Sequence, residues 1–72
     1  MYQAKLRFRG GTRIVDGVTA WRDEAGTLVL VTAAGEQRHT LAHFADQTRG
    51  GLASWVVSAM VGEEWKPIAV GG

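Results

Sequence analysis

Two histidines, His39 and His43, lie four residues apart and are the candidates for metal chemistry. If their segment were helical, both imidazoles would lie on one face and could bind one metal ion, as the histidines of zinc proteases do. Thr40 stands where those enzymes carry their catalytic glutamate, and only Asp46 or Glu36 could supply a third ligand. The alternative is two partly exposed histidines near a strand end, and the missing glutamate favours this alternative over a metal-dependent enzyme.

Other catalytic arrangements are missing from the sequence. Ser54 and Ser58 are not set in the Gly-x-Ser-x-Gly turn that activates a nucleophile, and the chain has no cysteine. The glycine pairs at 10–11 and 50–51 lack the further glycines and the lysine of a phosphate-binding loop. We therefore predict no catalytic residue, no cofactor and no enzymatic activity.

A row of cations is the candidate binding surface. Lys5, Arg7 and Arg9 alternate with apolar residues and Arg13 follows a Gly-Gly reversal, so these four cations could line a stripe of ~15 to 20 Å. Phosphate groups or an acidic protein could bind such a stripe, with aromatic rings stacking on nucleic-acid bases. The alternative is that outward cations only protect a sheet edge from aggregation. In that case they would pair with acidic residues of neighbouring strands, among Glu24, Glu36, Glu63 and Glu64.

Tryptophan is the third signal, because the chain has three in 72 residues. A core this small can bury one or two indole rings completely, so at least one ring should be partly exposed. Trp65, between Glu64 and Lys66, is the first candidate, and Trp21, beside Arg22, is the second. Exposed tryptophan near arginine is typical of protein interfaces. The alternative is a ring that caps the open end of a barrel.

The elements that must position these side chains are predicted to be strands. Residues 2 to 9 alternate between apolar and polar, which turns the apolar side chains inward and the cations outward. A second strand over 12 to 22 changes phase at Asp16-Gly17, which predicts a bulge or a sharp bend. Residues 27 to 32 carry four consecutive apolar side chains, so they should be buried on both faces or covered on the outer one.

The second half of the chain is less regular. We expect a polar strand over 37 to 41 and a single helical turn within 42 to 48. Residues 52 to 61 mix helical spacing with β-branched side chains, and their length and composition favour a strand. A last strand over 65 to 70 requires Pro67 to lie at an edge or a bulge.

Together these elements describe one small domain over residues 1 to 72, because a chain of this length can enclose only one hydrophobic core. We predict an all-β fold, or a β-rich fold with one short helical turn. Its form would be a small, partly open antiparallel barrel of five or six strands, SH3-like or Sm-like. The Gly71-Gly72 tail should fray.

Composition limits the location and the partners. The net charge of +1 does not by itself imply nucleic acid, and no apolar run reaches the ~20 residues of a membrane span. The polar start is not followed by the apolar region of a signal peptide, so we expect a cytoplasmic protein with no membrane partner. The absence of asparagine and the abundance of Ala, Gly, Val and Arg indicate a GC-rich genome.

The residues 13–18, followed by 26–32 and by Gly35-Glu36, resemble a pattern found in small β-meander or barrel proteins of actinobacteria and actinobacteriophages. The resemblance covers about residues 5 to 44. It implies a β fold and a source, and it implies no activity, because these proteins share none.

We therefore expect a non-enzymatic interaction module, encoded by a phage or a mobile element, that binds a protein partner or itself. An unpaired strand edge and an exposed Trp/Arg surface would form the contact. The alternative is a nucleic-acid-binding barrel that uses the four cations of the first strand and its turn. A metal-dependent enzyme is the third interpretation.

Overall fold

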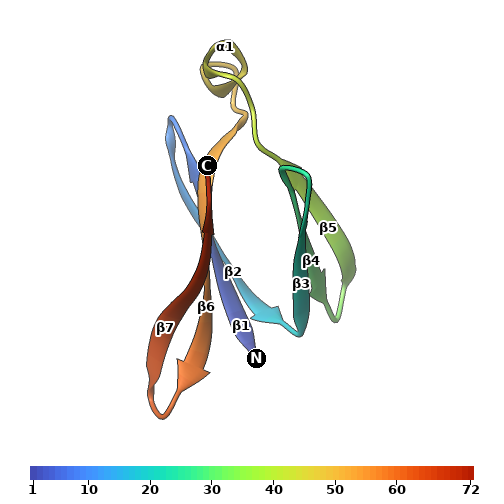
Figure 1. Cartoon of the computed structure of the whole chain (residues 1–72), viewed down its shortest axis with the longest axis vertical. Coiled ribbons are helices and arrows are strands. Elements are labelled where there is room, and N and C mark those ends of the chain that lie inside the picture. The colour runs from blue at the N-terminus through green and yellow to red at the C-terminus, as the bar shows by residue number, and fades with distance from the viewer.

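Seven strands and one short helix make up the computed structural model, which describes residues 1–72 (Figure 1). In chain order the elements are β1 (Tyr2–Phe8), β2 (Gly11–Val18), β3 (Ala20–Glu24), β4 (Thr27–Thr32), β5 (Gly35–Thr40), α1 (Phe44–Gln47), β6 (Leu52–Val61) and β7 (Glu64–Gly71). The predicted β-rich fold with one helical turn is confirmed. The helix has four residues, and no helix of the structure is long and apolar enough to cross a membrane.

The strands form two antiparallel sheets that face each other (Figure 1). One sheet has the order β2-β1-β6-β7 and the other has the order β3-β4-β5. Near the bend between β2 and β3, the backbone N–H of Thr19 donates to the carbonyl oxygen of Val31 at 2.8 Å and so ties the two sheets together. The two sheets do not close into a barrel, as expected for the predicted partly open β fold, and β7 is added outside β6. The six predicted strands appear as seven because the second divides at Thr19.

Two β-bulges lie where the sequence predicts irregular strands. The register between β1 and β2 shifts at Asp16-Gly17, and Gly17 has a φ of 68°, which glycine adopts without strain. Pro67 lies on the edge strand β7, beside a second shift that leaves Ile68 as the extra residue. Both irregularities are confirmed, and Pro67 meets both predicted conditions, an edge and a bulge.

The core lies between the two sheets, and Trp55 is its largest fully buried side chain. Trp21 of β3 packs on Trp55 of β6 with ring centroids 6.0 Å apart and planes tilted by 58°, so the two indoles join the sheets. The other members of the core are Ala4, Leu6, Val15, Val18, Leu28, Leu30, Leu52 and Val57.

The prediction that the Gly71-Gly72 tail frays is wrong for Gly71. This residue pairs with Trp55 at the end of β7, and its backbone lies directly against the indole. A Cβ atom built on Gly71 would come within 2.2 Å of Trp55 Cε2 and Nε1. The missing side chain therefore allows the strand end to close over the central tryptophan.

The outer surface of the three-stranded sheet carries an ion network of Arg22, Glu24, Glu36 and Arg38. Arg22 pairs with Glu24 and, at 3.2 Å, with Glu36, while Arg38 lies 3.2 Å from Glu24 and 3.0 Å from Glu36. Val29 lies between Arg22 and Arg38 in the strand register and is completely buried. The predicted cover on the outer side of β4 is confirmed, and it consists of charged side chains whose stems pack over an apolar one.

Acid should weaken this ion network. The pKa of the Glu24 carboxyl is lowered, first by the hydrogen bond from Arg22 and then by the one from Arg38, because both favour the carboxylate. A carboxyl whose pKa is lower in the folded state contributes stability above its ordinary pKa, and loses it as the pH falls through the folded value. We expect the melting temperature to drop more steeply below about pH 4.5 in the wild type than in Glu24→Gln. Glu63→Gln, at an exposed turn outside the network, should follow the wild type, and parallel curves for the wild type and Glu24→Gln would contradict this prediction.

Candidate functional site

The four predicted cations lie on three different surfaces and do not form one stripe. Lys5 and Arg7 point away from the core on the four-stranded sheet, where both line one hollow. Arg13 lies opposite Leu6, a core residue, and therefore points to the inner side of the sheet. Arg9 lies in the turn after β1, with its guanidinium carbon 5.0 Å from the centroid of the exposed Phe44 ring.

The register of the first hairpin explains why Arg13 is on the other face. Phe8 pairs with Gly11 across a two-residue turn, so the pairing of Leu6 with Arg13 follows by counting back along the two strands. Residues directly opposite each other in an antiparallel pair share a face. Counting residues outward from the tight turn at Gly10 in the sequence would have predicted that Arg13 points to the inner face.

Apolar side chains flank Lys5 on what we call the outer face, the side of the four-stranded sheet that points away from the three-stranded sheet. Lys5 pairs across strands with Ile14 of β2 and Val56 of β6, and Val56 pairs with Val70 of β7. Ile14 is 46% exposed and Val70 is 72% exposed. The outer face therefore has an apolar character that extends over β2, β6 and β7.

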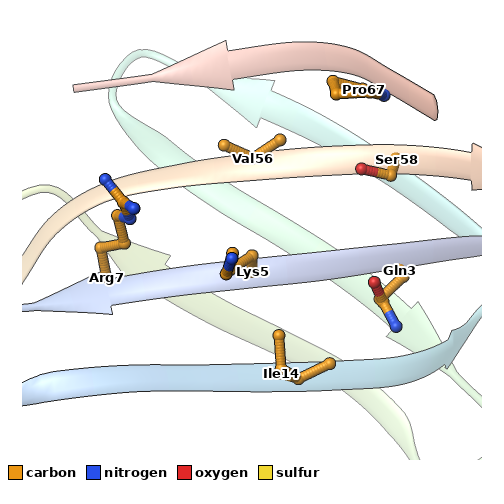
Figure 2. Close-up of a pocket in the computed structure, with 7 residues that line it drawn as sticks. All are labelled: Gln3, Lys5, Arg7, Ile14, Val56, Ser58 and Pro67. Carbon is orange, nitrogen blue, oxygen red and sulfur yellow. The ribbon is translucent and has the colours of Figure 1, made fainter. Parts of the chain in front are cut away.

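A hollow of about 390 Å³ lies in the middle of the outer face (Figure 2). Lys5 lies between Ile14 and Val56 in this view, while Arg7 leans toward β6. The residues that line the hollow come from all four strands and are Gln3, Lys5, Arg7, Ile14, Val56, Ser58 and Pro67. The hollow therefore offers two cationic groups beside aliphatic walls.

Neither cation of the hollow has an acidic partner. No carboxylate oxygen lies within 4.0 Å of the charged group of Lys5 or Arg7. The nearby Asp16 accepts a hydrogen bond of 2.8 Å from the side-chain amide of Gln3. Glu24 and Glu36, expected as possible partners, bind Arg22 and Arg38 on the other sheet instead. Two like charges thus lie two residues apart on one strand with no compensating charge on the face.

The two candidate tryptophans are both half-buried but lie in different environments. Trp65 pairs with Met60, which is 45% exposed, and so belongs to the outer face near the tip of the β6–β7 hairpin. Trp21 packs between the sheets against Trp55. Only Trp65 is therefore placed to contact a partner together with Lys5 and Arg7.

The two histidines do not meet the condition for sharing a metal ion, a helix that contains both. His39 is part of β5, with Nε2 at 3.2 Å from Gln37 Oε1, while His43 precedes α1, which begins at Phe44. No group of three or more His, Cys, Asp or Glu side chains is gathered anywhere in the structure. Partial burial, and then the positive charge of Arg13, lower the pKa of His39 and favour its neutral form.

Comparison with protein-family models, with curated proteins and with solved structures finds no match to this chain. Its function must therefore be inferred from its own surface. The outer face combines exposed apolar groups, unpaired cations and a hollow, and no other region of the molecule combines these features.

Proposed function

We propose that this chain is a non-enzymatic interaction module that binds a partner protein through its outer face. The observation that carries the proposal is the exposure of Ile14 and Val70, in the same cross-strand row as Lys5, together with two cations that lack acidic partners. Apolar side chains gathered on one exposed face are typical of binding surfaces, because a partner removes them from water. Arg7 and, farther along the same face, Trp65 belong to residue types that are enriched in protein interfaces.

The face supports this role better than the β7 edge of the sheet does. Pro67 lacks a backbone N–H group and lies on the edge strand β7, next to the bulge at Ile68. Both features hinder the addition of another strand at this edge. We therefore assign the contact to the side chains of the outer face. The proposed location of this interaction is the cytoplasm of a bacterium or of a phage's host.

The experiment compares two pairs of exposed apolar residues. We expect the double variant Ile14→Ser/Val70→Ser to retain at least about tenfold less of a partner captured from a bacterial lysate than the wild type does. The reason is that the substitutions remove apolar anchors of the interface. The matched control is Phe44→Ser/Val61→Ser, whose residues are 71% and 55% exposed and lie on α1 and at the tip of the β6–β7 hairpin. Retention is measured by quantitative mass spectrometry, with circular dichroism as the folding check. Equal loss in both variants, or no loss in the first, would refute a role for the outer face.

Nucleic-acid binding is the second candidate, and the unpaired Lys5 and Arg7 favour it. Two cations would release few counterions, so we expect a logarithmic salt dependence of only about −2 for duplex DNA. The direct neighbours of Lys5 are the aliphatic Ile14 and Val56, and the one tryptophan of the outer face, Trp65, lies several residues farther along the sheet, so bases bound at the cations would have no ring beside them to stack on. Fluorescence polarisation with labelled single- and double-stranded oligonucleotides at low salt tests this candidate, and absence of binding eliminates it.

A further inference from the structure

We propose that the partner segment that binds the outer face is an acidic, extended peptide with an aliphatic side chain on either side of its carboxylates. This inference depends on the proposed function and adds the chemistry of the partner. Two carboxylates of the peptide would pair with Lys5 and Arg7. Its aliphatic side chains would pack against Ile14 and Val56, the cross-strand neighbours of Lys5.

Charge complementarity is the first argument. Lys5 and Arg7 are half of the protein's cations that lack a carboxylate partner, since Arg22, Arg38, Arg49 and Lys66 are all paired. Both line the hollow, and Lys5 lies directly between Ile14 and Val56, so a partner that covers the face would exclude water and strengthen an ion pair there. A neutral partner would cover two cations without compensation, which is costly. An acidic partner removes this cost.

Spacing is the second argument. Lys5 and Arg7 are two residues apart on one strand, so their side chains leave the sheet about 6.6 Å apart. Two acidic residues at alternate positions of an extended peptide have the same separation, because the rise per residue is that of a strand. The apolar walls lie on the neighbouring strands, about 4.8 Å to either side. A peptide lying along β1 would therefore place its two carboxylates over Lys5 and Arg7, and its aliphatic side chains, before and after the carboxylates, would lean sideways to reach Ile14 and Val56.

A second copy of this chain fits the same surface poorly. In a two-fold dimer each outer face would meet an identical one, which brings Lys5 and Arg7 of both copies together. Asp16 is already hydrogen-bonded to Gln3, which lines the hollow, and Glu64 of β7 is paired with Lys66. The face therefore lacks the acidic groups that self-association would need.

The experiment uses a synthetic probe: a fluorescein-labelled peptide in which Leu, Glu, Glu and Leu alternate with Ser, so that all four point to one side when extended. We expect its affinity, measured by fluorescence polarisation, to fall about tenfold or more in Lys5→Glu/Arg7→Glu. The control variant Arg9→Glu/Arg13→Glu makes the same change of charge on other surfaces, and its affinity should stay within about twofold of the wild type. A peptide with Lys in place of Glu should restore binding to Lys5→Glu/Arg7→Glu.

The inference is overturned if a peptide with Gln in place of Glu binds as well as the glutamate peptide. It is also overturned if the two charge variants lose the same amount of peptide affinity, or if an oligonucleotide binds more tightly than the peptide. A wild-type dimer in light scattering that Ile14→Ser/Val70→Ser dissociates would make a second copy the occupant instead. If lysate capture depends on Ile14 and Val70 while the acidic peptide does not bind, the outer face remains the binding surface and only its acidic partner is refuted.

Discussion

Replacement of Trp55 by alanine is expected to reduce the free energy of unfolding by about 3 to 5 kcal/mol. A chain of 72 residues has only about 4 to 11 kcal/mol in total, so this loss would remove between about a quarter and all of the stability. Trp55 is 2% exposed and connects the two sheets through its contact with Trp21. Urea denaturation followed by circular dichroism measures the effect without depending on tryptophan fluorescence.

A second substitution separates the packing of Trp55 from its polar atom. The indole Nε1 is buried without a hydrogen-bond partner, which is unfavourable by about 1 to 3 kcal/mol. Trp55→Phe removes this N–H group and keeps an aromatic ring, so it should destabilise the protein much less than Trp55→Ala. Trp65→Ala, at a half-buried position on the outer face, is the control and should also have a smaller effect. A loss at Trp65 as large as that at Trp55 would contradict the assignment of the core.

The strands could be predicted where one face is buried and the local pattern is strict. Residues 2 to 8 alternate as expected, and Thr27–Thr32 is a strand with the predicted bounds. The bulge at Asp16-Gly17 was also readable, because the apolar residues on either side could not otherwise share a face. In each case the pattern lies within one strand, so it can be recognised in the sequence without knowing how the strands pair.

Features that depend on pairing between strands were harder to predict. The sequence left Trp55 as the buried ring, because Trp21 and Trp65 lie beside charged residues, but it did not predict that Trp21 packs on Trp55 from the other sheet. The ion network over Val29 joins residues of β3 and β5 that meet only across β4. Of the outer face, the sequence predicted Lys5, Arg7 and Trp65 as binding residues, while the apolar neighbours Ile14, Val56 and Val70 depend on strand order and register. Such contacts follow from the fold and cannot be read from one segment.

The end of β7 gives the sharpest contrast between the local pattern and the structure. Two terminal glycines suggest a mobile tail, yet Gly71 lies where any Cβ would meet the ring of Trp55. We expect Gly71→Ala to lower the free energy of unfolding by about 1 to 3 kcal/mol, because the added methyl group overpacks the core. Its backbone has no positive φ, so strain of the main chain would not explain the loss.

Gly10→Ala is the matched control for this steric effect. Gly10 also has no positive φ, and no atom lies within 4 Å of a Cβ built there, so the same methyl group should cause no loss of stability. Alanine should even raise stability slightly, by about 0.4 to 1 kcal/mol, because it restricts the unfolded chain. Both variants are compared in one urea titration. If Gly71→Ala is as stable as Gly10→Ala, the strand end does not rest on Trp55, and the core must be open to water at this end of the sheet.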